Sequence, residues 1–274
     1  MSSRIELRNV GQVFQVRDDG DRQLRDFVAL DGLELTIEAG EFLTIVGPSG
    51  CGKSTILDLI SGLTNPTSGT VLADRAVITD PGPDRSVVFQ QYTLLPWRTA
   101  LGNVELALEA VGGLNRAART ARAREVLELV GLGDFATRYP HELSGGMKQR
   151  VAIARSLSYQ PGVLLMDEPF GALDAQTRER LQEELIGIWR ATGTTIVFIT
   201  HDIEEAVFLG ERVAVMSNRP GRIKTIIDID LGVPQPDEDI RSTPQFAEYR
   251  HEIWSLLREG SVARSTLTEV HRVA

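Results

Sequence analysis

Apolar residues along the chain follow two patterns, alternation with polar residues in some segments and continuous runs in others. Alternation is expected of a strand with one buried face, and a short continuous run indicates a strand that is buried on both faces. We predict strands at residues 5–14, 30–37, 42–46, 71–78, 86–90, 163–166, 195–199, 213–217 and 222–229. The charged, glycine-containing stretch from Arg17 to Asp26 predicts a loop between the first two strands.

Apolar residues at intervals of three and four predict helices between these strands, and hence an α/β fold. The clearest patterns cover residues 55–63, 144–159, 174–192 and 203–209, and Ser144 and Asp174 are suitable N-cap residues. Residues 101–139 predict two helices separated by Gly112-Gly113, which form an inserted second lobe. After an irregular segment at 232–243, a C-terminal amphipathic helix is marked by Phe246, Ile253, Trp254, Leu256 and Leu257.

Composition excludes several classes of protein. The formal net charge of −9 does not favour non-specific binding to nucleic acid. The single cysteine, Cys51, excludes an internal disulfide, and one cysteine with four histidines gives no zinc pattern. Residues 1–10 lack the apolar core of a signal peptide, and no apolar run approaches the roughly 20 residues that span a bilayer. We therefore expect a chain that is soluble by itself, which does not exclude docking onto a membrane protein.

A glycine-rich loop follows the predicted strand at 42–46 and leads into a helix. It reads Gly47-Pro48-Ser49-Gly50-Cys51-Gly52-Lys53-Ser54-Thr55, which fits the phosphate-binding pattern G-x-x-x-x-G-K-[ST] in its required strand–loop–helix context. Glycines allow backbone N–H groups to surround an anion, and the helix N-terminus adds roughly half a positive charge. We expect Lys53 to reach the β- and γ-phosphates and the Ser54 hydroxyl to bind Mg²⁺. The loop predicts a nucleotide-binding protein, and Cys51 within it is either a redox switch or a small packing residue.

Two further segments carry candidate chemistry. Asp167-Glu168 ends an apolar strand, where ligands bind in open α/β sheets; one acid can hold Mg²⁺ and the other can orient or deprotonate the attacking water. Neighbouring residues on a strand point to opposite sides, so we expect different roles for the two acids. Ser144-Gly145-Gly146 is a second glycine turn before a helix and predicts a second anion site. If each site serves a different nucleotide, a second chain must complete it, which predicts a head-to-tail homodimer or a paired subunit.

Six segments together resemble, in order, the motif set of ATP-binding cassette (ABC) ATPases over residues 4–230. They are Gly47–Thr55, Gln90, Leu143–Arg150, Val163–Glu168, Ala172-Leu173-Asp174 and Thr200-His201-Asp202. The resemblance implies a P-loop NTPase (RecA-like) core with a mainly parallel sheet, an N-terminal antiparallel β-subdomain and an α-helical subdomain inserted at about 98–160. It implies an ATPase domain at 4–232 and a C-terminal tail with one amphipathic helix at 233–274.

Narrower features are similar to the ATPases of nitrate, sulfonate and taurine importers. They are Pro81–Arg85, Val88–Gln90, Leu94–Trp97, Asp167–Asp174, Arg219–Ile223 and the C-terminal stretch Ser242–Leu257. Lys148 stands where the family more commonly has Gln or Arg, and Gln91 where an acid is common. Both positions lie near partner-facing surfaces in the family, so the identity of the partner stays open.

The resemblance implies roles for individual residues. Lys53, Gln90, Glu168 and His201 are the expected catalytic residues, with Glu168 as general base or water-polarising group and His201 in contact with the γ-phosphate. The expected Mg²⁺ ligands are Ser54, Gln90 and Asp167. Phe14 resembles the aromatic residue that stacks on adenine, and a core phenylalanine is the alternative interpretation.

Other implied roles concern partners. Ser144, Gly145 and Gly146 would complete the nucleotide site of a second copy, and Asp174 would reach across the dimer. Leu94–Val104 lies where such ATPases receive a membrane-embedded permease. These partners would place the chain at the cytoplasmic face of the inner (plasma) membrane.

The resulting hypothesis is the ATP- and Mg²⁺-dependent subunit of an ABC importer. Two copies would clamp two nucleotides, and closure and hydrolysis would drive uptake of a small anion such as nitrate, a sulfonate or taurine. A separate permease, served by a substrate-binding protein, would carry the anion, so the ATPase sequence does not determine the substrate. Two alternatives stay open: an exporter ATPase, and a soluble ABC protein acting on nucleic acid or ribosomes. A single cassette, no heptads and a net charge of −9 disfavour the second alternative.

Overall fold

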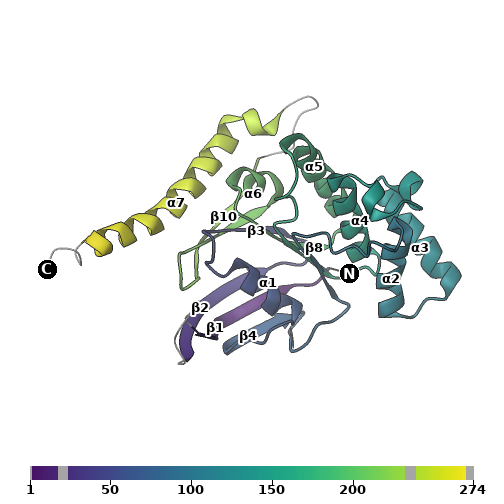
Figure 1. Cartoon of the computed structure of the whole chain (residues 1–274). Helices are drawn as coiled ribbons and strands as arrows, with labels where there is room; N and C mark the ends of the chain where they lie inside the picture. Colours follow the sequence, from purple (N-terminus) through teal and green to yellow (C-terminus); the bar gives the residue numbers. More distant parts are fainter. Residues whose placement is uncertain (1, 18–23, 232–238, 270–274) are drawn as a thin grey trace. The chain divides into compact units, whose positions relative to one another are not determined.

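The computed structural model describes residues 2–17, 24–231 and 239–269, with side chains up to residue 258 (Figure 1). These residues form two compact units. The first, which we call the helix-rich unit, contains residues up to 3, 39–41 and 81–197. The second, the sheet-rich unit, contains residues 4–38, 42–80 and those from 198 onwards.

An antiparallel sheet with the order β2-β1-β4-β5 lies in the sheet-rich unit, and Figure 1 shows β2, β1 and β4 side by side. Its strands are β1 (Ile5–Arg17), β2 (Leu24–Ile37), β4 (Ser68–Ala73) and β5 (Ala76–Val77). β1 pairs with β2 from Ile5↔Ile37 to Arg17↔Leu24, and with β4 from Ile5↔Ala73 onwards. This sheet confirms the predicted antiparallel β-subdomain.

Two boundaries in this sheet differ from the sequence prediction. The loop predicted from Arg17 to Asp26 is wrong at both ends, since Arg17 belongs to β1 and β2 begins at Leu24; residues 18–23 lie outside the described part. These strand ends are exposed and pair through their backbones, so the hydrophobic pattern does not reveal them. The strand predicted at 71–78 is two strands, because Asp74 and Arg75 adopt φ of 47° and 72° in a two-residue hairpin turn.

A second set of strands in the sheet-rich unit carries the glycine-rich loop. β3 (Phe42–Val46) pairs in parallel with β9 (Arg212–Met216), and β9 pairs antiparallel with β10 (Ile223–Asp228). Every residue of β3 is buried, as its continuous apolar run predicts. Helix α1 (Lys53–Ser61) follows the loop, and α6 (Ile203–Leu209) follows β8 (Thr195–Thr200), the strand along which the chain passes from the helix-rich to the sheet-rich unit.

The C-terminal helix also belongs to the sheet-rich unit. After a 3₁₀ turn at Ile240–Ser242, α7 (Pro244–Glu269) confirms the predicted helix. Two of its residues, Phe246 and Ile253, are buried in one cluster with residues of α6 and β9, namely Ala206, Val207, Val213 and Val215. The helix therefore shares a hydrophobic core with its unit. Most of the segment predicted to be irregular, residues 232–238, lies outside the described part.

The helix-rich unit contains the parallel strands β6 (Arg85–Val88) and β7 (Val163–Asp167). Its helices are α2 (Ala100–Val111), α3 (Arg116–Leu129), α4 (Gly145–Leu157) and α5 (Ala175–Thr192), with 3₁₀ turns at Gly133–Phe135 and Pro140–Glu142. The two helices predicted between residues 101 and 139 are confirmed as α2 and α3, and Gly112 and Gly113 between them adopt φ of 80° and 81°. Helices α2, α3 and α4 contact one another.

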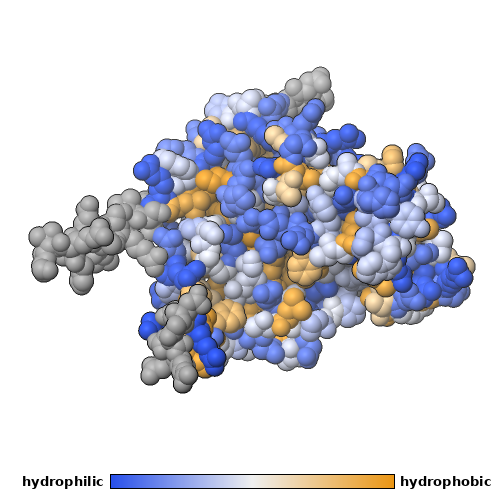
Figure 2. Space-filling model, in the orientation of Figure 1, coloured by the Kyte–Doolittle hydropathy of each residue, from blue (hydrophilic) through white to orange (hydrophobic). Residues whose placement is uncertain are grey.

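Together the elements confirm the predicted α/β class. Within the described residues, no helix is both long and apolar enough to cross a membrane. Hydrophilic residues cover most of the face drawn in Figure 2, where hydrophobic residues form separate patches.

Candidate functional site

The glycine-rich loop lies between β3 and α1, as its pattern predicts. Gly50 and Gly52 adopt φ of 71° and 103°, in the left-handed region that favours glycine. Gly52 is the N-cap of α1 and has no side chain, whereas the N-cap side chains of α2, α4 and α5 accept first-turn N–H groups. The N-terminus of α1 therefore offers donors without a side-chain acceptor, an arrangement that suits a bound anion.

Two polar residues begin α1 beside these donors. Lys53 is buried, and its Nζ donates to the carbonyl oxygens of Gly47 (2.8 Å) and Pro48 (3.2 Å). Ser54, the next residue, is exposed. The ammonium group is thereby held against the backbone of the loop, and the Ser54 side chain is open to a ligand.

Cys51 packs inside the loop. Its side chain is buried, and Sγ lies 3.8 Å from Sδ of Met216 on β9. A Cβ on Gly47 would lie 2.7 Å from this Sγ, so the glycine leaves room for the thiol. Burial raises the pKa of the Cys51 thiol above its ordinary value, which disfavours the reactive thiolate. These contacts support the packing interpretation of Cys51 over the redox switch.

Phe14 lies on β1, opposite Phe27 of β2. Its side chain is 36% exposed, so the alternative interpretation as a core residue is not supported. An exposed aromatic ring on a strand offers a face on which a planar ligand can stack.

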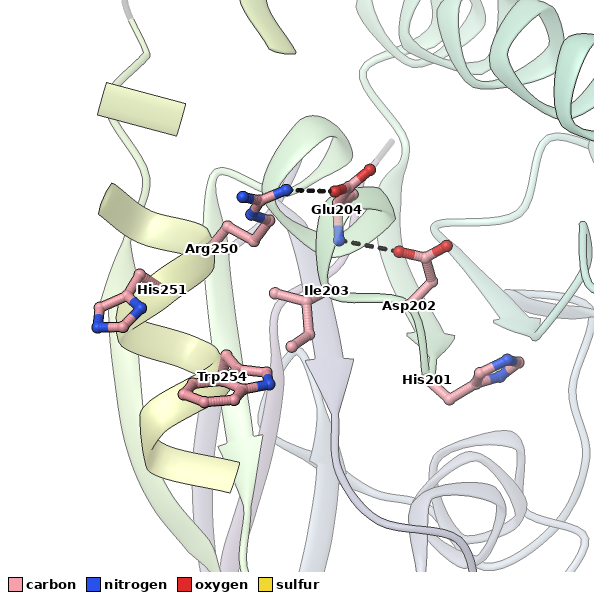
Figure 3. A pocket seen from close by; sticks show the side chains of 7 residues that line it. All are labelled: His201, Asp202, Ile203, Glu204, Arg250, His251 and Trp254. Atoms are coloured by element: carbon pink, nitrogen blue, oxygen red, sulfur yellow. Dashed lines mark hydrogen bonds and ion pairs between the residues drawn. The ribbon is translucent and has the colours of Figure 1, made fainter. Parts of the chain in front are cut away.

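His201 is exposed immediately after β8 and lines a cavity of about 710 Å³, together with residues of α6 and α7 (Figure 3). Asp202 is the N-cap of α6, because its Oδ1 accepts from the N–H groups of Glu204 (2.9 Å) and Glu205 (3.3 Å) in the first turn. Arg250 of α7 donates to Glu204 Oε1 at 2.7 Å. Figure 3 shows the His201 ring pointing away from α7.

Asp167 and Glu168, at the end of β7 in the helix-rich unit, do not lie on one strand. Asp167 is the last residue of β7, and Glu168 follows it with φ of +45°. The prediction that the two acids alternate along a strand is therefore wrong, because Glu168 has left the extended conformation. The Gly171 N–H donates to the Glu168 carbonyl oxygen (3.1 Å), and a Cβ on Gly171 would lie 3.5 Å from Gln90 Nε2. The structure thus brings Gln90 next to the turn that begins at Glu168.

The second glycine turn begins α4, as predicted. Ser144 is the N-cap, and its Oγ accepts from the Met147 N–H at 3.3 Å. A Cβ on Gly146 would lie 2.7 Å from Cγ2 of Thr177 on α5, so a larger residue here would require the Thr177 side chain to move. The turn therefore packs directly on the first turn of α5.

Asp174 is the N-cap of α5. Its Oδ1 accepts from the Thr177 N–H at 3.0 Å, and this hydrogen bond lowers the pKa of Asp174 below its ordinary value. Since Thr177 contacts both Gly146 and Asp174, the structure brings the second glycine turn and Asp174 together at neighbouring helix N-termini.

The segment Leu94–Val104 leads into α2 and is organised by Asn103. This side chain is fully buried; its Oδ1 accepts from the Leu95 N–H (2.7 Å), and its Nδ2 donates to the carbonyl oxygens of Leu95 (3.2 Å), Arg98 (3.1 Å) and Thr99 (3.0 Å). Trp97, within the same segment, is 70% exposed. The segment is therefore an ordered loop that presents an aromatic side chain to solvent.

The predicted site residues are divided between the two units. Phe14, residues 47–55 and His201 belong to the sheet-rich unit, and the other predicted residues belong to the helix-rich unit, namely Gln90, Ser144–Gly146, Asp167, Glu168 and Asp174. In the part of the chain that the structure describes, no three His, Cys, Asp or Glu side chains gather into a metal-binding cluster.

Sequence reasoning missed the residues that contact the loop from β9 and the turn after it. Arg219 Nε donates to the Gly50 carbonyl oxygen at 2.9 Å, and a Cβ on Gly221 would meet the Cys51 carbonyl oxygen at 2.0 Å. The stretch Arg219–Ile223 indicates a family resemblance, but no spacing in the sequence links it to a loop 169 residues earlier.

Comparison with known proteins identifies the family. The family model described as ABC transporter matches residues 30–171. The nitrate import ATP-binding protein NrtD of Synechocystis sp. is 52% identical over 238 residues, which cover 84% of this chain and 88% of that protein. The taurine import ATP-binding protein TauB of Rhizobium johnstonii is 48% identical over 241 residues, which cover 86% of this chain and 92% of that protein.

A solved structure has the same fold. It is a dimeric post-hydrolysis state of the ATP-binding cassette MJ0796 bound to ADP and Pi, with a TM-score of 0.70 and 37% sequence identity. The match covers 84% of this chain and 100% of that chain, and it confirms the predicted P-loop ATPase fold. The chain belongs to the ABC transporter family, as one of its ATP-binding, ATP-hydrolysing subunits.

Proposed function

We propose that this ATPase is the energy-coupling subunit of an importer for a small anion such as nitrate, a sulfonate or taurine. The main evidence for a nucleotide site is the glycine-rich loop. Helix α1 begins there without a side-chain cap, so its first N–H groups can bind a phosphate. Relatives named as nitrate and taurine import ATP-binding proteins, at 52% and 48% identity, support import over export.

The loop would bind the phosphates of ATP through its backbone N–H groups, with Lys53 as the neighbouring positive charge. Ser54, Gln90 and Asp167 offer the oxygen donors that suit Mg²⁺, which needs few protein ligands because phosphates and water complete its shell. Bound Mg²⁺ would neutralise negative charge on the phosphates. Phe14 offers an exposed ring on which adenine can stack.

The remaining polar groups would act on the attacking water and the γ-phosphate. Glu168 would accept a proton from the water or polarise it, Gln90 would orient the water, and His201 would donate to the γ-phosphate. Catalysis of this kind depends mainly on positioning and electrostatic stabilisation.

A second copy of the chain would complete each nucleotide site. Ser144, Gly145 and Gly146 form a second turn at a helix N-terminus, with Asp174 at the neighbouring one, and we propose that this surface faces the nucleotide of the partner. The dimeric state of the solved cassette supports this assembly. The division into an ATPase domain at 4–232, with a helical subdomain at about 98–160, and a tail at 233–274 is part of the same proposal.

A membrane permease would dock on Leu94–Val104, where Trp97 is exposed on an ordered loop. This docking would hold the ATPase at the cytoplasmic face of the inner membrane, and a substrate-binding protein would act through the permease. Copurification tests the importer: affinity-tagged ATPase from detergent-extracted membranes should carry an integral membrane subunit. Recovery of nucleic acid or ribosomes in place of that subunit would instead support the non-transport alternative.

Substitution of Glu168 by Gln tests the chemical step. Loss of a general base should reduce steady-state ATP hydrolysis at least about 100-fold, while ATP binding persists and the dimer lives longer. Glu183→Gln is the matched control, because Glu183 is an exposed acid on α5 of the same unit. If Glu168→Gln hydrolyses ATP as fast as Glu183→Gln does, the role of Glu168 is refuted. A separate variant, Lys53→Ala, tests the nucleotide site, and wild-type affinity for ATP in this variant would refute that site.

A further inference from the structure

The turn after β9 packs against the glycine-rich loop. Residues 217–222, which we call the supporting turn, are closed by a hydrogen bond from the Ser217 N–H to the Arg222 carbonyl oxygen (2.9 Å). Two backbone hydrogen bonds join the turn to β2. The Gly221 N–H donates to the Ala29 carbonyl oxygen (2.8 Å), and the Asp31 N–H donates to the Gly221 carbonyl oxygen (3.2 Å). An ion pair between Arg222 and Asp31 adds to this attachment.

The supporting turn contacts the loop at consecutive residues. A Cβ on Gly50 would lie 2.5 Å from a terminal nitrogen of Arg219, and one on Gly221 would lie 2.0 Å from the Cys51 carbonyl oxygen. Gly50 therefore provides both a left-handed backbone (φ 71°) and the space in which the Arg219 side chain lies.

Arg219 fixes the peptide group between Gly50 and Cys51. The carbonyl oxygen of this group accepts from Arg219 Nε at 2.9 Å, and its N–H, on the Cys51 side, donates to the Pro48 carbonyl oxygen at 3.3 Å. Because a trans peptide is planar and its C=O and N–H point in opposite directions, the two hydrogen bonds together determine its orientation.

The same guanidinium group also contacts the strand pair that carries Phe14. Its central carbon lies 4.5 Å from the centroid of the Phe27 ring, and Phe27 stands opposite Phe14 in the β1–β2 register. One side chain thus connects the loop that would bind the phosphates with the strands that present the exposed aromatic ring.

We propose that Arg219 is a positioning residue for the bound nucleotide. By holding the Gly50 carbonyl oxygen while it stacks on Phe27, it keeps the loop in the conformation that receives phosphates, and its positive charge favours an anion there. The inference rests on the proposed function of the loop as the nucleotide site. Arg219 acts on binding rather than on the chemical step.

The experiment compares Arg219→Ala, Arg219→Lys and Arg222→Ala. Arg222→Ala is the matched control, because it removes the same charge from the same turn. The ion pair with Asp31 that it breaks is exposed and contributes little, and the two backbone hydrogen bonds of Gly221 still attach the turn to β2. For Arg219→Ala, loss of an exposed charge-assisted hydrogen bond should raise the Kd and the KM for ATP about fivefold, with kcat within about twofold of wild type. Arg219→Lys should recover part of the affinity, since lysine keeps the charge but lacks the planar group that stacks and donates together. Arg222→Ala should keep the wild-type Kd.

Phe27→Leu provides a second test of the connection. It should weaken ATP binding by itself, and in the double variant with Arg219→Ala it should weaken binding no further, because the two side chains act as one unit. Equal Kd values for Arg219→Ala and Arg222→Ala would overturn the proposal. A purely structural role for Arg219 predicts that Arg219→Ala lowers the thermal midpoint and kcat but leaves KM unchanged, and this result would also overturn it. If the wild-type protein binds ATP without hydrolysing it, the proposed function fails while the Kd comparison still tests Arg219.

Discussion

Replacement of Ile253 by alanine tests whether the C-terminal helix is part of the core of the sheet-rich unit. Ile253 is 0% exposed and lies in one cluster with Phe246 of the same helix and with residues of α6 and β9. The substitution removes three carbons, which corresponds to a transfer free energy of about 2.4 kcal/mol at about 0.8 kcal/mol for each buried group. The cavity left by incomplete collapse raises the loss of unfolding free energy to about 3 kcal/mol.

The measurement is urea unfolding followed by far-ultraviolet circular dichroism, with the midpoint compared at unchanged slope. Glu252→Ala is the matched control, because its side chain is exposed on the same helix, and the free energy of unfolding should change by no more than about 0.5 kcal/mol. Ile253→Val should fall between the two, with a loss of about 1 kcal/mol. If Ile253→Ala unfolds at the same urea concentration as Glu252→Ala, the helix does not contribute to this core and the reasoning is refuted.

Two further predictions follow from shifted pKa values. Burial raises the pKa of the Cys51 thiol, so native protein at about pH 8 should react with iodoacetamide far more slowly than urea-unfolded protein; equal rates would contradict the packing interpretation. The hydrogen bond from the Thr177 N–H lowers the pKa of Asp174, so the folded state favours the ionised carboxylate. Its contribution to stability should be present above the ordinary aspartate pKa of 3.8 and be lost as the pH falls through the lowered value in the folded protein. The difference in thermal midpoint between wild type and Asp174→Asn should therefore vanish in acid, and a difference independent of pH would contradict the assignment.

Elements with local signals at their ends could be predicted from the sequence. Ser144 and Asp174 are N-caps of helices that begin at the next residue, and Gly112-Gly113 separates two helices as expected. The glycine-rich loop is equally local, because its glycines, lysine and serine stand in one continuous segment between a strand and a helix. In each case the residues that specify the structure are neighbours along the chain.

Features that depend on distant residues could not be predicted in this way. The left-handed φ of Glu168 could not be predicted either, because the apolar run and the two acids of the sequence indicate only a strand end. The contact between Arg219 and Gly50 joins residues 169 positions apart, and no periodicity encodes it. The amphipathic pattern around Ile253 predicted a helix with an apolar face, but it could not show that α6 and β9 cover that face.

The buried Asn103 has a consequence for any partner that binds the Trp97 loop. Each side chain or loop that becomes ordered on binding makes the free energy of association less favourable, by roughly 0.5–1.5 kcal/mol per flexible side chain. Here four hydrogen bonds of one amide side chain already fix the loop backbone in the isolated chain. The entropy of ordering this backbone is lost when the protein folds, so the affinity of a partner depends mainly on the contacts it makes with a preorganised surface.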